Sequence, residues 1–394
     1  MSKPEVYIVS AVRTAIGSFG GSLKDIPPCQ LATTVVGAAL QRSGYAADRI
    51  GHVVLGNVIP TEPRDAYVSR VAALNAGIPQ EAPAFNVNRL CGSGLQAIIS
   101  AAQSLLLGDT DVAIGGGVES MSRGPYMLPG ARWGGRMGDM QAVDYMLGAL
   151  HDPLHRIHMG VTAENIAEHL GITREAQDVL ALESQKRAAR AIADGHFHGQ
   201  IVPVEVKSRK GVQLFEVDEH VRADTSFEQL AAMKAVFKEG GSVTAGNASG
   251  LNDGAAALVM ATEAAIKADG LSPLARLVSY AQAGVDPKMM GLGPIPATLL
   301  ALQRAGLQVS DLDVIESNEA FAAQACAVTR ELGLDPARVN PNGSGISLGH
   351  PIGATGAVIV TKAIHELHRI KGRYALATMC IGGGQGIAAI FERV

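Results

Sequence analysis

The sequence passes through the same order of predicted elements twice, and this repetition constrains the fold more than any other feature. Each copy has a short strand, a Val-Asn pair, a glycine-rich loop, a helix, a second strand and three consecutive glycines. The first copy comprises strand 53–55, Val87 and Asn88, helix 95–107, strand 111–114 and glycines 115–117. The second comprises strand 313–315, Val339 and Asn340, helix 357–369, strand 374–379 and glycines 382–384. We therefore predict an internal duplication.

Alternating strands and helices predict an α/β layered fold built from two halves. We expect residues 1–120 to form the N-terminal half, completed by about residues 245–272, and residues 273–394 to form the C-terminal half. Residues 121–244 differ, because they hold the only Trp, seven of the eleven His residues and a long charged helix predicted over 173–194. We interpret this segment as an inserted subdomain.

The composition excludes several classes of protein. Hydrophobic residues make up 47% and charged residues 18% of the 394 residues, which is typical of a globular chain and not of a disordered one. The formal net charge of −4 argues against binding to nucleic acid or to a membrane surface. The N-terminus lacks a signal-peptide pattern, and we identify no apolar stretch of 18 or more residues, so we expect a cytoplasmic protein.

No metal or disulfide is expected. The four cysteines, at positions 29, 91, 326 and 380, are too dispersed for a CxxC motif and are expected to be reduced thiols. His151, His155 and His158 have the spacing of metal ligands, but no cysteine joins them and their segment is charged.

Two of these cysteines lie beside glycines, where they could carry chemistry. Cys91, in LCGSG, precedes a predicted helix whose dipole and free N–H groups would stabilise a thiolate; the alternative is an ordinary buried cysteine. Cys380, in CIGGGQG, ends a predicted strand, and the following glycine N–H groups suit an oxyanion site. The alternative there is a tight turn between two strands.

Two polar residues of the second half complete the set of candidates. His350 lies in GSGISLGHPIGATG, a loop rich in Gly and Pro, which favours a general base over a core histidine. Asn318, in SNEAF, stands between a predicted strand and a predicted helix. It is either the N-cap of that helix or an amide donor directed into a site.

Together these loops resemble the thiolase family. The matching segments are CGSG with Cys91, NEAF with Asn318, GHPIGATG with His350 and CIGGGQG with Cys380. Further matches, VRTAIGSFGG, GGGVESMS, HMGVTAEN and TAGNASGLNDGAAA, extend the resemblance over essentially the whole chain. The pattern is most similar to bacterial biosynthetic-type β-ketothiolases and acetyl-CoA C-acetyltransferases. It implies a duplicated five-layered αβαβα fold with an inserted loop subdomain.

The resemblance also implies a reaction and its catalytic residues. Cys91 would attack acetyl-CoA after His350 takes its proton, and Cys380 would remove an α-proton from a second acetyl-CoA. The carbanion would then attack the acyl-Cys91 intermediate to give acetoacetyl-CoA and CoA. His350 and a water held by Asn318 would stabilise the enolate, and the N–H groups of Cys91 and Gly382 the tetrahedral intermediate.

Further residues match the family's contacts to CoA, which is expected as substrate and product with no other cofactor. They are Leu150, His158, Met159, Arg222, Phe237, Ser249, Met290, Ala320 and Phe321. Gln229 stands where biosynthetic relatives often carry Ser, near the adenine pocket. Residues 120–140 resemble the tetramerisation loop of these relatives, so a homotetramer built as a dimer of dimers is expected. The implied roles lie in fatty acid metabolism or the supply of polyhydroxyalkanoate precursors.

Three other functions are weighed against a short-chain thiolase. A degradative 3-ketoacyl-CoA thiolase of broader chain length is close to it, because HDPLHRIHMG resembles enzymes that accept more than acetyl groups. A ketoacyl synthase shares the fold but would need His or Asn in place of Cys380. A non-catalytic acyl-CoA-binding protein is disfavoured by the presence of both cysteines, His350 and Asn318.

Overall fold

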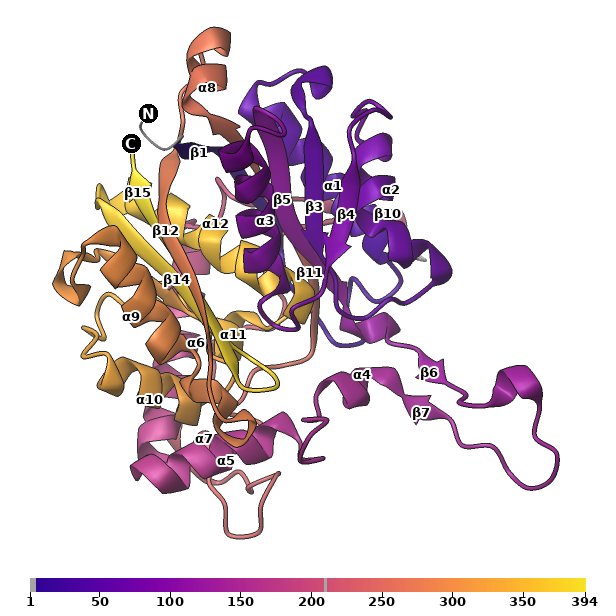
Figure 1. Cartoon of the computed structure of the whole chain (residues 1–394). Helices are drawn as coiled ribbons and strands as arrows, with labels where there is room; N and C mark the ends of the chain where they lie inside the picture. The colour runs from indigo at the N-terminus through magenta and orange to yellow at the C-terminus, as the bar shows by residue number, and fades with distance from the viewer. Residues whose placement is uncertain (1–4, 209–210) are drawn as a thin grey trace.

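A mixed sheet runs through the whole molecule in the computed structural model, which describes residues 5–208 and 211–394 (Figure 1). It has eleven strands, and its main path is β13-β14-β15-β12-β1-β11-β5-β3-β4. In chain order these strands are β1 (Val6–Thr14), β3 (His52–Gly56), β4 (Ala84–Val87), β5 (Val112–Ser120), β11 (Asn252–Thr262), β12 (Ala275–Gly284), β13 (Val314–Ser317), β14 (Tyr374–Ile381) and β15 (Gln385–Arg393). Two short strands, β2 (Gly17–Ser18) and β8 (Ile201–Val202), pair with β11 and β1.

The helices form three layers: one lies between the two halves of the sheet, and one lies on the outer side of each half. Their bounds are α1 (Pro28–Ser43), α2 (Val68–Asn75), α3 (Ser93–Leu107), α4 (Tyr145–Ala149), α5 (Met159–Leu170), α6 (Arg174–Ala193), α7 (Phe227–Ala231), α8 (Glu263–Asp269), α9 (Pro294–Ala305), α10 (Ala322–Glu331), α11 (Gly345–Leu348) and α12 (Ile352–Ile370). Helices α3 and α12 pack against each other in the middle, with α1 and α2 outside the N-terminal strands and α9 and α10 outside the C-terminal ones. The predicted five-layered αβαβα arrangement is confirmed.

The predicted duplication is visible in the strand pairing. In the N-terminal half β3 runs parallel to β4, and the register places Val87 beside Gly56. In the C-terminal half Val339 forms a parallel bridge with Ile315 of β13. A central helix follows each of these valines, and the halves join where β1 pairs with β12. The Val-Asn pairs therefore occupy matching places.

The two triple glycines do not match, which corrects the sequence interpretation. Gly115, Gly116 and Gly117 lie inside β5, where all three are buried. A Cβ on Gly117 would lie 2.2 Å from the Gly353 carbonyl oxygen of α12, and one on Gly115 would lie 2.7 Å from Ile98 Cα of α3, so these two glycines let the central helices approach the sheet closely. Gly383 and Gly384 instead have φ of 81° and 80° in the β14–β15 turn.

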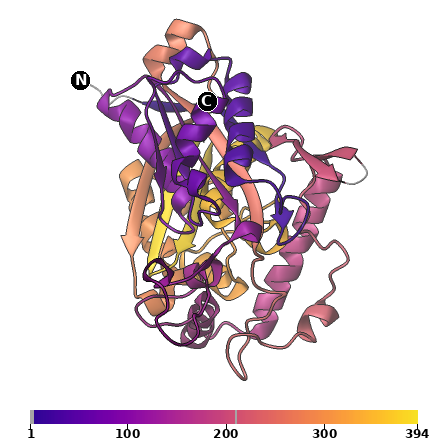
Figure 2. The same ribbon diagram turned by 90° about the vertical axis from the view of Figure 1, so that its right-hand side faces the viewer.

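Residues 121–244 do not form one compact unit. Strands β6 (Tyr126–Met127) and β7 (Val143–Asp144) form an arm that projects from the body (Figure 1). Helices α5 and α6 pack on α10, and β9 (Val204–Ser208) pairs with β10 (Gly211–Phe215). Figure 2 shows this segment along the bottom and right-hand side of the molecule. The predicted long helix is α6, which Thr173 caps by accepting a hydrogen bond from the Ala176 N–H.

One prediction about hydropathy is wrong. The window Leu90–Leu107 is long and apolar enough to cross a membrane, although we expected no such stretch. It contains α3, and 67% of the window is buried inside the fold. Most of α3 is buried because it lies between sheet and helix in the central layer, and its polar residues Gln96, Ser100 and Gln103 share one face.

Candidate active site

A cavity of about 380 Å³ opens at the ends of the two central helices and brings together most of the predicted site residues. Four of the five proposed catalytic residues line it: Cys91, His350, Cys380 and Gly382. So do eight of the nine predicted CoA contacts: Leu150, His158, Met159, Phe237, Ser249, Met290, Ala320 and Phe321. Asn318 reaches the site through a contact with His350, and Arg222 lies in a neighbouring pocket.

Cys91 stands in a tight connection between β4 and α3. Leu90 has a positive φ of 46°, and the Ser93 hydroxyl donates to the Leu90 carbonyl oxygen at 2.6 Å. Burial raises the pKa of the Cys91 thiol to about 11, although the backbone N–H groups of Gly382 and Cys91 lower it. The N–H groups at the start of the helix therefore do not by themselves produce the expected thiolate, because the effect of desolvation on the pKa is larger than theirs. Cys91 needs a base.

Cys380 lies at the end of β14 and is only 1% exposed. It packs in an apolar cluster with Met159, Met290 and Phe321. Burial raises the pKa of its thiol, and the neighbouring Cys91 raises it further. The electrostatic coupling between the two sulfurs follows from their sharing one cavity.

His350 is held on both sides of its ring. Its backbone N–H donates to Asn252 Oδ1 at 2.9 Å, its Nδ1 lies 2.7 Å from Thr355 Oγ1, and its Nε2 lies 3.5 Å from Asn318 Nδ2. Burial lowers the pKa of His350 to about 4. The ring is therefore neutral at physiological pH.

Asn318 is not a helix N-cap, which decides between the two sequence interpretations. Helix α10 begins at Ala322, and its N-cap residue is Phe321. The Asn318 backbone N–H donates to the Thr378 carbonyl oxygen at 3.0 Å. Its Oδ1 atom is buried and has no hydrogen-bond partner within residues 5–208 and 211–394. The amide is therefore free to hold a further polar group.

Glycines place the cysteine loop against the histidine loop. A Cβ on Gly94 of α3 would lie 2.7 Å from the Ala357 N atom, and one on Gly356 of α12 would lie 2.2 Å from the Leu95 N atom. The two helices therefore cross with their backbones in contact, just after Cys91 and just after His350. This crossing brings together residues that are far apart in the sequence.

The site also depends on a buried carboxyl group that the sequence analysis missed. Glu119 of β5 accepts hydrogen bonds from the N–H groups of Val58 and Ile59, each at 3.1 Å, and of Gly353 at 2.9 Å. Burial raises the pKa of Glu119 to about 8. Glu119 thus ties the start of α12 to the N-terminal half. It lies in the quoted GGGVESMS segment, to which we had assigned no role.

A second, more polar pocket of about 480 Å³ shares Ala245 and Gly250 with the first. Arg222, His220 and Gln229 line it. The Gln229 side chain accepts from the Ser226 N–H at 2.8 Å, as part of the cap of α7. Together the two pockets form a channel that is apolar beside Cys91 and polar beside Arg222.

An ion pair with both side chains fully buried anchors the segment that carries Arg222. Arg13 of β1 binds both carboxylate oxygens of Asp218 at 2.7 and 2.9 Å, and each side chain is 0% exposed. Asp218 Oδ1 also accepts from the Ile16 N–H at 2.9 Å. Arg13 lies in the VRTAIGSFGG segment that resembles thiolases, but no pattern in the sequence indicated that it pairs with Asp218.

Comparison with known proteins agrees with this geometry. Residues 6–264 match the thiolase N-terminal domain, and residues 271–393 match the thiolase C-terminal domain. This chain belongs to the thiolase family. It is 69% identical over 391 residues to beta-ketothiolase BktB of Cupriavidus necator, and 50% identical over 391 residues to an acetyl-CoA acetyltransferase of Pseudomonas aeruginosa, covering 99% of each chain in both cases. Human mitochondrial 3-ketoacyl-CoA thiolase in complex with CoA has a similar fold, with a TM-score of 0.97 at 43% identity over 99% of this chain and 98% of that one.

The family predicted from the four loops is therefore confirmed, including its similarity to β-ketothiolases and acetyl-CoA acetyltransferases. The thiolase is an enzyme of an acyltransferase family. Its matches extend over both halves and leave out only a few residues at the ends and at the junction 265–270.

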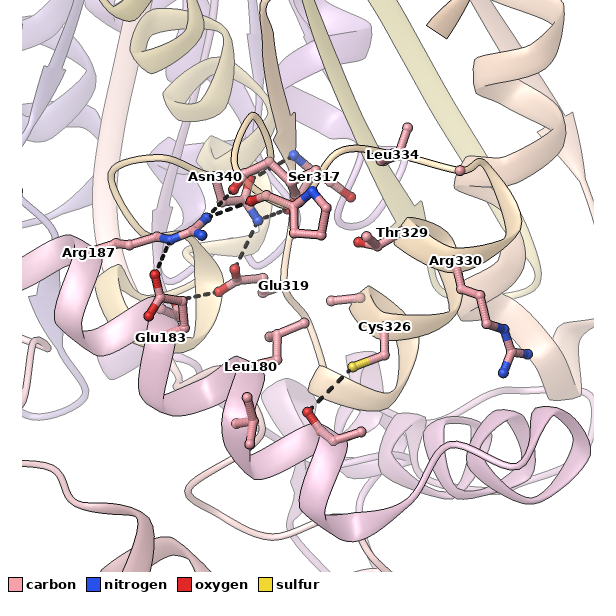
Figure 3. A pocket seen from close by; sticks show the side chains of 17 residues that line it. Leu180, Glu183, Arg187, Ser317, Glu319, Cys326, Thr329, Arg330, Leu334 and Asn340 are labelled. Atoms are coloured by element: carbon pink, nitrogen blue, oxygen red, sulfur yellow. Dashed lines mark hydrogen bonds and ion pairs between the residues drawn. The ribbon is translucent and has the colours of Figure 1, made fainter. Parts of the chain in front are cut away.

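A further cavity of this thiolase, of about 590 Å³, lies between α6, α10 and the segment 333–340. Figure 3 shows Glu319 and Asn340 directed toward each other on its wall. The Glu319 carboxylate accepts from Asn340 Nδ2 at 2.9 Å and from the Ser184 hydroxyl at 2.6 Å. Because Glu319 directly follows Asn318, these bonds fix the backbone that carries the Asn318 amide.

The three spaced histidines of the thiolase do not converge on one point: the rings of His151 and His158 are in edge-to-face contact, with a centroid distance of 5.2 Å, and His155 is directed elsewhere. Only His158 lines the catalytic pocket, where its ring stacks on Phe237 with a centroid distance of 4.6 Å. His155 instead contacts Asp152 at 3.0 Å. Within residues 5–208 and 211–394, no three His, Cys, Asp or Glu side chains gather as a metal site.

Proposed function

We propose that this thiolase catalyses the reversible Claisen condensation of acyl-CoA units. Two acetyl-CoA molecules give acetoacetyl-CoA and CoA, and the reverse reaction cleaves 3-ketoacyl-CoA. The observation that carries the proposal is the sharing of one cavity by Cys91, Cys380 and His350. Two thiols and a neutral imidazole are the groups that acyl transfer followed by α-proton removal requires.

The first half-reaction acylates Cys91. His350 Nε2 takes the proton of the Cys91 thiol, and the thiolate attacks the thioester carbonyl carbon of acetyl-CoA. The carbon–sulfur bond to CoA breaks, and Cys380 protonates the departing CoA sulfur. The enzyme is left with acetyl-Cys91, a Cys380 thiolate and a protonated His350.

The second half-reaction forms the carbon–carbon bond. The Cys380 thiolate removes an α-proton from a second acetyl-CoA, and the enolate carbon attacks acetyl-Cys91. The bond to the Cys91 sulfur breaks, and His350 returns the proton to Cys91. All protons then stand where they began, with acetoacetyl-CoA as product.

Two oxyanions form along this path. His350 Nε2–H and a water bound by the Asn318 amide serve the enolate, and the N–H groups of Cys91 and Gly382 serve the tetrahedral intermediate. The influence of the Gly382 N–H on the Cys91 sulfur supports this assignment. Each such donor contributes on the order of 3 kcal/mol to lowering the barrier.

The apolar lining of the cavity supports a substrate range that includes acyl chains longer than acetyl. Beside Cys91, apolar side chains continue the cavity: Met121, Leu147, Leu251 and Ile352. The relative from Cupriavidus necator carries the name beta-ketothiolase, which agrees with a 3-ketoacyl-CoA as the substrate of cleavage. We therefore keep the degradative 3-ketoacyl-CoA thiolase as the second candidate function.

CoA is the proposed substrate and product, with no other cofactor. The apolar channel receives the pantetheine arm, where Ser249 offers a polar side chain and Phe237 a stacking face. Arg222, exposed in the polar pocket, provides a positive charge for a CoA phosphate.

We also propose a homotetramer in the cytoplasm, built as a dimer of dimers through the arm of residues 120–140. The arm exposes large apolar side chains, with Trp133 at 88% and Met137 at 96% exposure. A second copy of this chain would cover such a surface. A role in fatty acid metabolism or polyhydroxyalkanoate precursor supply remains part of the proposal.

The deciding experiment is CoA-dependent cleavage of acetoacetyl-CoA and of 3-ketohexanoyl-CoA by the wild type and by Cys91→Ala. Cleavage of both, abolished in the variant, supports a broad β-ketothiolase. Cleavage of acetoacetyl-CoA alone supports a short-chain acetyltransferase. Folded wild type that cleaves neither would overturn the proposal in favour of a non-catalytic acyl-CoA-binding protein.

A further inference from the structure

We propose that Thr355 is a positioning residue, whose hydroxyl holds His350 in the tautomer with its proton on Nδ1 and leaves Nε2 free to exchange protons with Cys91. The inference rests on the proposed function, because it concerns how His350 acts in that reaction. No resemblance or motif assigned a role to Thr355.

The hydroxyl has a single proton and two neighbours. Thr355 Oγ1 lies 2.9 Å from the Pro351 carbonyl oxygen and 2.7 Å from His350 Nδ1, and both contacts are buried. A carbonyl oxygen can only accept, so the hydroxyl donates to Pro351. Its oxygen must then accept a proton from His350, which places that proton on Nδ1.

The contact on the other side of the ring agrees with the same tautomer. His350 Nε2 faces Asn318 Nδ2, a donor, at 3.5 Å. A donor there requires a lone pair on Nε2. The backbone that carries the ring is also held, because the His350 N–H donates to Asn252 and a Cβ on Gly349 would lie 2.5 Å from the Asn252 side chain. The low pKa of His350 agrees with a neutral ring.

This arrangement suits both half-reactions. Nε2 first accepts the Cys91 proton and then, protonated, donates toward the substrate oxygen, while Nδ1–H stays bonded to Thr355 throughout. Without the hydroxyl, the neutral tautomer with its proton on Nε2 becomes accessible, and in that form Nε2 cannot accept a proton. A second partner that orients the base is a recurring requirement in nucleophilic catalysis.

A purely structural role is the competing explanation. Threonine hydroxyls in helices often bond the carbonyl four residues earlier, and the Pro351 contact by itself has this geometry. The test must therefore separate the acceptor function of the oxygen from packing.

Thr355→Ala and Thr355→Ser differ by one oxygen atom and lack the same methyl group, so they form a matched pair. We would measure kcat and KM for acetoacetyl-CoA cleavage, the rate of Cys91 alkylation by iodoacetamide between pH 6 and 9, and the thermal unfolding midpoint. The serine variant should keep kcat within about threefold of the wild type, since it retains the acceptor. The alanine variant should lose kcat by roughly tenfold to a hundredfold with KM unchanged, and Cys91 should alkylate correspondingly more slowly.

Equal behaviour of the alanine and serine variants in kcat and alkylation would overturn the proposal, whether both resemble the wild type or both fall together. If the alanine variant fails to fold, Thr355→Val, which conserves the shape, replaces it. A wild type without thiolytic activity would refute the proposed function instead. In that case the alkylation rates of the matched pair still test whether the hydroxyl controls proton transfer from Cys91.

Discussion

Gly356 of α12 lies directly against Leu95 of α3, so closely that a Cβ on the glycine would stand 2.2 Å from the Leu95 backbone nitrogen. Leu95 follows Cys91 by four residues, and Gly356 follows His350 by six. The contact between these two backbones therefore sets where the proposed nucleophile lies relative to its base. It also joins the two halves of the molecule in the central layer.

We predict that Gly356→Ala destabilises the protein by about 1–3 kcal/mol, because the added methyl group must force the two helices apart. It should also lower kcat, since the separation moves Cys91 away from His350. Gly37→Ala in α1 is the matched control, because no atom lies within 4 Å of its Cβ position. That change should stabilise the protein by about 0.5–1 kcal/mol. Urea unfolding measures both, and equal effects would contradict the close crossing.

Cys380→Ala should separate the two half-reactions. Condensation should fall by at least about a hundredfold, because the base for α-proton removal is lost. Acetyl-CoA should still acylate Cys91, but more slowly, because Cys380 no longer protonates the departing CoA sulfur, and peptide mass spectrometry should find the acetyl group on Cys91. Cys326→Ala is the control, since Cys326 lies outside the catalytic cavity. A Cys380→Ala variant that condenses acetyl-CoA normally would show that another group is the base.

The buried His350 should contribute to the pH dependence of stability. Its pKa falls from 6.5 in the unfolded chain to about 4 in the folded protein, so its contribution is fully present above pH 6.5 and is lost as the pH falls toward 4. About 2 kcal/mol is lost by pH 5. His350→Asn lacks this term, so the destabilisation that it causes should shrink by that amount between pH 7.5 and 5.

Comparing the variant with the wild type is necessary because buried carboxyl groups act with the opposite sign. The raised pKa of Glu119, about 8, gives stability that is present below pH 4.5 and is lost as the pH rises through 8. The wild type and the His350→Asn variant share the contribution of Glu119, so it cancels when their unfolding free energies are subtracted. A pH-independent cost of His350→Asn in urea unfolding would mean that the histidine is not buried as a neutral ring.

Asp218→Ala should destabilise the protein by about 3–5 kcal/mol, because it leaves the buried Arg13 charge unpaired. The KM for CoA should rise as well, since Asp218 anchors the segment that carries Arg222. Glu263→Gln breaks an exposed pair with Lys267 and should change the unfolding free energy by less than about 1 kcal/mol. Similar unfolding energies for the two variants would show that the Arg13–Asp218 pair contributes little.

The amino-acid sequence predicted the layered fold, the duplication and a set of residues proposed to carry the reaction. Alternating strand and helix patterns required layers, and the repeated Val-Asn pairs marked matching strand ends, as the Gly56–Val87 and Ile315–Val339 pairings confirm. Residue character and local sequence made Cys91, Asn318, His350 and Cys380 candidates, and the resemblance of their segments to the thiolase family implied their roles. These features are local, because each depends on a few consecutive residues.

Only the tertiary structure decided how these residues act together. Desolvation in the shared cavity raises the Cys91 pKa and lowers that of His350, and burial is not visible in a short motif. Glycines 115–117 follow a predicted strand in the sequence, but only the structure shows that they lie inside β5 and that Gly117 makes a close contact with α12. The partners Glu119 with Gly353 and Arg13 with Asp218 join residues more than 200 positions apart. Such pairings exist only once the chain has closed on itself, because hydrogen bonds and ion pairs depend on distance in space and not along the sequence.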